Sequence, residues 1–143
     1  MNIEEAEQQI IGEFAPLSDW MDKYEYLIDL GKSLPPFDEK SKIEQNLIGG
    51  CQSRVWLDAR YENGRVYYSA DSDAIITKGI VSLLVRVLSG QPPKDIVAAE
   101  LHFIDTVGLK ENLSPSRANG LLAMIKQMKI YALIYEQQQK AQG

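Results

Sequence analysis

The strongest constraint on the fold is a single hairpin signal in a chain whose other patterns are helical. Val55-Trp56-Leu57 and Val66-Tyr67-Tyr68 are rich in strand-forming residues, and the Asn63-Gly64 pair between them favours a tight hairpin turn. Asn46-Leu47-Ile48 is expected to add a third strand before the Gly49-Gly50 turn. An isolated hairpin is only marginally stable in water, so the sheet needs helices against one face. The sequence therefore predicts an α+β fold, with a small three-stranded antiparallel sheet packed against helices.

Apolar residues at helical spacing predict helices on both sides of this β region, which spans residues 46–72. The expected helices are residues 2–13, a helix from an N-cap at Ser18 to a stop at Gly31, a helix capped by Asp71-Ser72-Asp73 that runs to about residue 89, a short helix from Pro93 to Ala99, and a final helix with Ser114 at its N-cap and Pro115 at N1. The polar run Gln137-Gln138-Gln139-Lys140 is expected to fray.

Composition excludes several classes of protein. One domain covering residues 1–143 is expected, because 143 residues with 45% apolar content suit one core. The formal charge of −5 argues against nucleic-acid binding, which needs a basic surface. No stretch approaches the roughly 18 apolar residues of a membrane span. The acidic N-terminus is unlike a secretory signal, and a single cysteine forms no internal disulfide, so these features favour the cytoplasm.

Cys51 is the residue with the most chemical potential. An isolated cysteine in an intracellular protein is more often a small buried hydrophobe than a reactive group. Here Gly49-Gly50 precedes it and Gln52-Ser53 follows, which indicates a turn rather than a core strand. Glycines allow another protein to approach the backbone closely, and successive N–H groups in a turn favour a thiolate. The residues alone therefore leave both a structural and a reactive thiol open.

Several kinds of thiol chemistry fit the sequence poorly. A disulfide switch needs a second cysteine, and a phosphatase needs a phosphate-binding loop that Gln52-Ser53-Arg54 does not continue. A cysteine hydrolase would depend on His102, the only histidine, whose apolar neighbours favour a structural role. Metal binding is disfavoured because Asp71 and Asp73 are better explained as helix-capping residues. A thiol that attacks, carries and releases sulfur needs no second cysteine and no internal base.

Five stretches in order carry a resemblance to the SufE-type sulfur-acceptor proteins over nearly the whole chain. They are Trp20 to Gly31 (W-x-x-K-Y-x-Y-L-I-D-L-G), Asn46 to Trp56 (N-x-I-x-G-C-Q-S-x-V-W), Asp71 to Gly79 (D-S-D-A-x-I-x-K-G), Pro93 to Val97, and Leu113 to Ile125 (L-S-P-S-R-x-x-G-L-x-A-M-I). The chain departs from the family pattern at Gly49, where a polar residue is expected. Its C-terminal tail is also longer than the family pattern.

The resemblance implies a function and its partners. It implies a fold like that of the cluster scaffold IscU, with Cys51 as sulfur acceptor on a loop between two strands. The implied donor is a pyridoxal-phosphate cysteine desulfurase of the SufS or CsdA kind, which the chain stimulates. The implied recipient is a SufB-type scaffold for iron–sulfur cluster assembly. The chain itself would be a carrier rather than an enzyme, with no cofactor or metal of its own. The alternative is a regulatory adaptor that docks on a desulfurase without carrying sulfur.

Other residues of the matching stretches have roles that are less fixed. Gly49, Gly50 and Gln52 are candidates for loop movement or partner contact, with Cys51 resting against apolar side chains until docking. Lys78 is either a solvated helix lysine or a contact residue. Arg117 falls at N3 of the final helix, where a cation is unfavourable. The local sequence allows either an ion pair with an acidic residue such as Glu111 or a functional role. The resemblance favours the second, so we expect Arg117 to lie on the same surface as the Cys51 loop and to dock the desulfurase or steady a sulfur anion.

Buried aromatic residues and helical glycines complete the expectations. Trp20, Tyr24 and Trp56 are expected to pack in the core rather than contact a partner. Gly79 and Gly120 lie inside expected helices, where glycine costs up to about 1 kcal/mol relative to alanine. Each is therefore expected to mark a close approach between elements.

Overall fold

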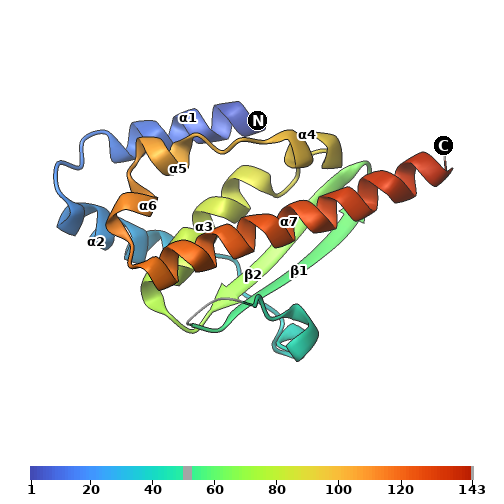
Figure 1. Ribbon diagram of the computed structural model, residues 1–143, viewed down its shortest axis with the longest axis horizontal. Coiled ribbons are helices and arrows are strands. Elements are labelled where there is room, and N and C mark those ends of the chain that lie inside the picture. Colours follow the sequence, from blue (N-terminus) through green and yellow to red (C-terminus); the bar gives the residue numbers. More distant parts are fainter. Residues whose placement is uncertain (50–52, 143) are drawn as a thin grey trace.

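The helices pack against a two-stranded antiparallel hairpin (Figure 1). The computed structural model describes residues 1–49 and 53–142. Strands β1 (Val55–Glu62) and β2 (Arg65–Ser72) pair in a register that runs from Val55 opposite Ser72 to Glu62 opposite Arg65. Asn63 and Gly64 both have positive φ, at 53° and 77°, as a tight hairpin turn requires. The predicted hairpin is confirmed.

The predicted third strand is wrong for the described residues. Glu44–Asn46 forms a short 3₁₀ turn, η2, and only Leu47 pairs with the sheet, through an isolated antiparallel bridge to Trp56. The Ile48 amide donates to the Val55 carbonyl at 2.9 Å. The run 46–48 is too short to form a strand, because its first residue still belongs to the turn. It acts instead as a two-residue attachment along the edge of β1.

Helices account for most of the remaining chain, and all five predicted helices are present. The helical elements are α1 (Ile3–Phe14), α2 (Trp20–Lys32), η1 (Glu39–Ser41), α3 (Ile75–Leu88), α4 (Pro93–Ala98), α5 (Phe103–Thr106), α6 (Leu109–Asn112) and α7 (Pro115–Gln142). The four-residue helices α5 and α6 were not predicted, and α7 continues through the polar run that was expected to fray.

Helix ends differ from the expectations at α2 and α3. Asp19 rather than Ser18 caps α2, accepting a hydrogen bond from the Asp22 amide at 2.8 Å. The N-cap position of α3 is Ala74, and no side chain caps it. Asp71 and Ser72 belong to β2, too early in the chain to cap the helix. The prediction of a capping cluster is therefore wrong, and these side chains are available for other partners.

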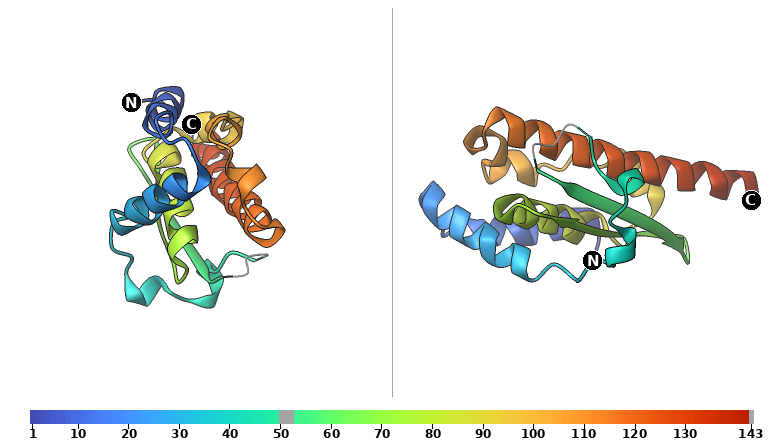
Figure 2. Two further views of the ribbon diagram at one scale, coloured as in Figure 1. Left: turned by 90° about the vertical axis from the view of Figure 1, so that its left-hand side faces the viewer. Right: turned by 90° about the horizontal axis from the view of Figure 1, so that it is seen from below.

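Helix α3 lies at the centre of the fold, between α2 and α7, as both views of Figure 2 show. Its apolar face is buried almost completely, with Leu83, Leu84, Val87 and Leu88 at 1% exposure or less. Gly79 is where α2 crosses α3, because a Cβ there would lie 2.1 Å from the Leu27 carbonyl oxygen. The close approach predicted at Gly79 is confirmed. Gly31 faces the same contact, with its Cβ position 3.0 Å from the Gly79 nitrogen.

The long helix α7 lies along the hairpin and is fastened to it by three tyrosines. The Tyr68 hydroxyl donates to the Met128 carbonyl at 2.5 Å, and the Tyr135 hydroxyl donates to the Ala59 carbonyl at 3.2 Å. The Tyr135 ring stacks on Tyr61 with ring centres 5.2 Å apart. These contacts hold the middle of α7 on the hairpin. Its first turns lie near the start of α3 and the start of β1, where Arg117, Thr77 and Val55 line one cavity (Figure 1).

Candidate functional site

The structure describes the chain on either side of the segment that carries Cys51. Gly50, Cys51 and Gln52 lie outside the described residues. Gly49 is exposed, and a Cβ there would meet no described atom within 4 Å, so packing against the described residues does not require glycine. On the other side, Ser53 is half-buried and leads directly into the buried Val55 at the start of β1.

Ser53 borders a small cavity between β1, α3 and α7. The cavity is lined mainly by apolar side chains, among them Ile80 and Leu84 from α3 and Leu121 and Met124 from α7. Its free volume is about 30 Å³, enough for an atom or two of the size of a water oxygen. The polar groups at its wall come from Ser53, Thr77, Ser116 and Arg117. Ser53, two residues after Cys51 in the sequence, therefore lies beside an apolar space with a cation at its edge.

Arg117 lies at this cavity with no acidic partner among the residues that the structure describes. Its amide donates to the Ser114 hydroxyl at 3.3 Å, as expected for N3 of a helix with Ser114 at the N-cap. Its guanidinium Nη1 donates to the Tyr24 hydroxyl at 3.2 Å. In residues 1–49 and 53–142, neither Glu111 nor another carboxylate forms an ion pair with it. Tyr24, on α2, thus orients the Arg117 guanidinium and leaves its other N–H donors for a further partner.

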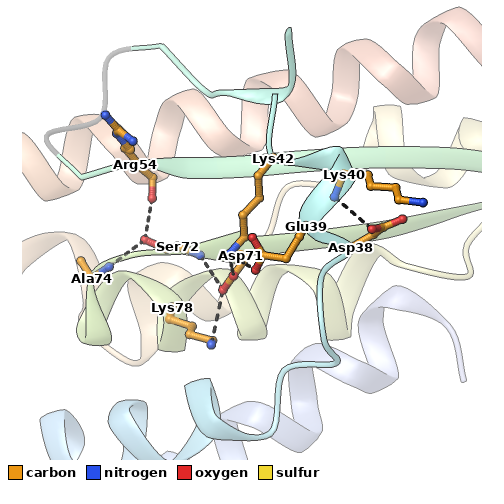
Figure 3. Close-up of polar contacts among 9 residues, drawn as sticks. All are labelled: Asp38, Glu39, Lys40, Lys42, Arg54, Asp71, Ser72, Ala74 and Lys78. Atoms are coloured by element: carbon orange, nitrogen blue, oxygen red, sulfur yellow. Dashed lines mark hydrogen bonds and ion pairs between the residues drawn. The ribbon is translucent and has the colours of Figure 1, made fainter. Parts of the chain in front are cut away.

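Lys78 has a structural partner. Its ammonium lies 3.3 Å from Oδ1 of Asp71, which connects the start of α3 to the end of β2. The other oxygen of this carboxylate, Oδ2, lies 3.1 Å from the ammonium of Lys42, which follows η1 in the chain leading to Cys51 (Figure 3). Lys42 also pairs with Glu39 at 3.0 Å and lies 5.2 Å from the ring centre of the half-buried Trp56.

Asp71 is held ionised by these partners. Partial burial raises the pKa of Asp71, but hydrogen bonds from Lys42, the Ser72 amide and Lys78 outweigh it, so the net pKa is lowered. Hydrogen bonds to Glu39 and Asp71 raise the pKa of Lys42 in turn. Both groups are therefore charged at neutral pH.

The chain that follows Cys51 is attached to Ser72 and Asp73, the two residues after Asp71. The Ser72 hydroxyl donates to the Arg54 carbonyl at 2.9 Å and accepts from the Ala74 amide at 3.2 Å (Figure 3). The Arg54 amide donates to Oδ1 of Asp73 at 3.0 Å, and the Asp73 amide donates to the Arg54 carbonyl at 3.2 Å. Asp71-Ser72-Asp73 therefore holds the chain on both sides of residues 50–52. Sequence reasoning missed Lys42, which no local pattern distinguishes from other surface cations. It also missed Arg54, which contributes its backbone amide and carbonyl rather than its charge.

His102 and the aromatic residues singled out in the sequence have partners of their own. His102 precedes α5, is largely exposed, and pairs with Glu100 at 3.2 Å. Among residues 1–49 and 53–142, no three His, Cys, Asp or Glu side chains are grouped so that they could hold a metal ion. No helix in the described part of the chain is long and apolar enough to cross a membrane. Trp20, Tyr24 and Trp56 are all half-buried rather than core residues: Trp20 and Tyr24 pack against the core from outside, and Trp56 lies beneath Lys42.

The fold and this site define a small α+β protein whose one cysteine lies four residues before the first strand of the hairpin in the sequence. The family model described as SufE, Fe-S metabolism associated domain, matches residues 8–132. A SufE-like protein 1 of Arabidopsis thaliana, named as chloroplastic/mitochondrial, is 43% identical over 130 residues, which are 90% of this chain and 35% of that protein. An uncharacterized SufE-like protein of Rhizobium etli is 40% identical over 126 residues, 85% of each chain. The chain belongs to the SufE family.

A solved structure supports the fold independently. The solution structure of a hypothetical protein from Thermus thermophilus superimposes with a TM-score of 0.72 over 89% of this chain and 93% of that chain, at 22% sequence identity. The resemblance to SufE proteins found in the five sequence stretches is thus confirmed by the family model and by relatives at about 40% identity. Family membership points to a role in Fe–S metabolism and sulfur transfer.

Proposed function

We propose that Cys51 accepts sulfur from the persulfide of a SufS- or CsdA-type cysteine desulfurase, stimulates that enzyme, and delivers the sulfur to a SufB-type scaffold. One observation carries the proposal: the only cysteine of a SufE-family chain lies two residues before Ser53, which shares an apolar cavity with Arg117. The chain spans 35% of the Arabidopsis relative, so partners are proposed for this domain alone.

The proposed transfer is a thiol exchange. The Cys51 thiolate attacks the terminal sulfur of the partner's persulfide, the S–S bond breaks, and the partner's cysteine leaves as a thiolate. Cys51 becomes a persulfide, and the proton lost from its thiol neutralises the departing thiolate. The number of S–S bonds is unchanged, so no external oxidant or reductant is needed. Pyridoxal phosphate serves the earlier step on the desulfurase, where cysteine gives up its sulfur.

Arg117 and the cavity have separate roles in this proposal. Arg117 steadies negative charge on sulfur or on the docking partner, because its guanidinium has donors beyond the one engaged by Tyr24. The cavity offers an apolar resting place for the Cys51 side chain, which would shield the thiol and slow over-oxidation in a chain with no second cysteine. Gly49, Gly50 and Gln52 then allow the thiol to reach a partner.

The rival proposal is an adaptor that regulates the desulfurase without carrying sulfur. The two differ at Cys51, which an adaptor can lose. The experiment is intact mass spectrometry after incubation with a cognate desulfurase and cysteine, together with the rate of alanine formation. The wild-type chain should gain one or more sulfur atoms that reductant removes, and Cys51→Ser should gain none.

Thermal unfolding of Cys51→Ser supplies the control for folding. A serine variant that folds normally, gains no sulfur and no longer stimulates the desulfurase supports the carrier. If the serine variant stimulates the desulfurase as strongly as the wild-type chain, the carrier proposal fails and the adaptor is correct.

A further inference from the structure

An apolar groove lies where α4 packs against α7 (Figure 1). Val97 lines it from α4, the rest of its wall comes from α7, and its free volume is about 350 Å³. Leu122, Ile130 and Leu133 line this α4–α7 groove with exposed fractions of 46%, 38% and 45%. Single exposed apolar side chains are ordinary, whereas several that share one groove mark a site of interaction.

The shape of the α4–α7 groove suits a helix. Leu122 and Leu133 are eleven residues apart, which is about 17 Å, or three turns, along α7. An amphipathic helix of similar length places apolar side chains at every third or fourth residue into such a groove. An extended peptide would instead need the open backbone of a strand edge, and the wall of this groove is made of helix side chains.

The charge of the groove is positive. Its two charged residues are Lys126 and Lys129, and in the part of the chain that the structure describes no carboxylate lines it or pairs with either lysine. Lys126 is exposed, and the Lys129 ammonium donates to the neutral carbonyl of Ala99 at 2.5 Å. A basic groove in a chain of formal charge −5 favours an occupant that carries carboxylates.

Two other occupants fit this charge less well. A two-fold contact between copies of the chain uses the same patch twice, so Lys126 and Lys129 would face their own equivalents. Like charges across an interface disfavour it. An anionic lipid surface would attract the two lysines but repel a chain whose formal charge is −5.

We propose that the α4–α7 groove binds an amphipathic helix of another protein, whose apolar face packs on Leu122, Ile130 and Leu133 and whose acidic residues pair with Lys126 and Lys129. No α7 residue lines both this groove and the cavity beside Ser53. A helix in the groove therefore leaves that cavity uncovered, and its binding does not depend on Cys51.

The probe is a fluorescein-labelled peptide of about four helical turns, with leucine at every third or fourth residue, glutamate on both flanks and alanine elsewhere. A matched peptide has lysine in place of each glutamate, and a third has the composition of the first in scrambled order. Fluorescence anisotropy with the full chain gives the Kd of each. The acidic peptide should bind at least about tenfold more tightly than the lysine peptide, and the scrambled peptide should not bind.

Charge reversal tests the two lysines. Lys126→Glu/Lys129→Glu should make the lysine peptide the tighter ligand. Lys32→Glu/Lys40→Glu is the matched control, because it changes the net charge equally in α2 and η1, and it should keep the preference for the acidic peptide. Lys126→Glu alone should weaken the preference while keeping the bond from Lys129 to Ala99, so a folding defect of the double variant does not decide the result.

The apolar contacts need a separate variant. Leu133→Ser should weaken binding of the acidic peptide roughly tenfold, because a leucine side chain loses its burial. Met21→Ser, which removes an apolar side chain that is 68% exposed outside the groove, should leave binding unchanged.

Several results would overturn the proposal. They are no binding of the acidic peptide at millimolar concentration, equal binding of the acidic and lysine peptides, and an unchanged preference after charge reversal. A dimer in sedimentation equilibrium that Leu133→Ser dissociates would assign the groove to a second copy instead. Binding to phosphatidylserine vesicles that Leu133→Ser abolishes would assign it to a lipid surface. Cys51→Ser should bind the acidic peptide as the wild-type chain does, so failure of sulfur loading would leave this result standing.

Discussion

The crossing of α2 and α3 at Gly79 predicts a large effect for the smallest possible substitution. In Gly79→Ala the new Cβ would lie 2.1 Å from the Leu27 carbonyl oxygen and 2.7 Å from its carbon, whereas ordinary contacts begin near 3.4 Å. Both atoms belong to the backbone of α2, so no side-chain rotation relieves the clash. The two helices must separate by more than 1 Å at a place where Leu27 is completely buried.

The magnitude follows from two opposing terms. Overpacking costs about 1–3 kcal/mol, and a rigid backbone contact belongs at the upper end of that range. Alanine recovers about 1 kcal/mol of helix propensity relative to glycine. The expected net loss is about 2 kcal/mol in the free energy of unfolding, which corresponds to a melting temperature lower by roughly 4–10 °C.

Denaturant and thermal unfolding of Gly79→Ala and of a matched control measure the effect. Gly12 lies inside α1, where a Cβ would meet no described atom within 4 Å. Gly12→Ala should therefore raise stability by up to about 1 kcal/mol. A loss of stability in Gly79→Ala together with a gain in Gly12→Ala would show that the helix crossing, rather than helix propensity, decides the effect at Gly79. Equal stabilisation of both variants would refute the reasoning, because it would mean that α2 and α3 separate at no cost.

Two further predictions concern charged groups. Arg117→Met should change the melting temperature little, because loss of the Tyr24 hydrogen bond is offset by removal of a cation from the positive end of α7. Sulfur loading by a desulfurase should fall in Arg117→Met and be partly retained in Arg117→Lys, which keeps the charge. A destabilised Arg117→Met with normal sulfur loading would contradict this prediction. Hydrogen bonding from Arg86, opposed by burial and aided by a hydrogen bond from Tyr26, lowers the pKa of Glu13 below its usual value of 4.5. The Glu13–Arg86 pair therefore contributes about 1 kcal/mol to the free energy of unfolding above that pH, and this contribution is lost as the pH falls through the lowered pKa. Glu13→Gln should therefore lose less stability on acidification than the wild-type chain in urea titrations, and parallel losses would argue against the pair.

Much of the fold could be predicted because the information was local. Asn63-Gly64 specifies a hairpin turn through the positive φ of two adjacent residues. Pro115 after Ser114 specifies the start of α7, because proline lacks the backbone N–H that later helix positions need. The longer helices repeat apolar residues over several turns. Helices α5 and α6 have four residues each, too few for any such repeat, and were missed for that reason.

The errors fall where a local pattern had two possible partners. Asn46-Leu47-Ile48 has strand-like composition, yet pairing depends on which edge of β1 the chain reaches after η2, and only Leu47 forms a bridge there. Asp71-Ser72-Asp73 resembles a capping cluster, yet Asp71 pairs with the ammonium of Lys42, and Ser72 and Asp73 bond the backbone of Arg54, both distant in sequence. Composition cannot choose between a near amide and a remote ammonium, because that choice depends on the path of the whole chain.

The sequence by itself determined the hairpin, the order of the long helices, the family, and Cys51 as the only cysteine. Only the tertiary structure decided that Arg117 and Ser53 share a cavity, that Lys78 is engaged by Asp71, and that Lys42 reaches the same carboxylate. A motif records residue types that are close along the chain. The contacts that hold the Cys51 segment join residues 71–73 to residues 18 to 29 positions earlier, and such pairs are fixed only when the helices and the hairpin pack together.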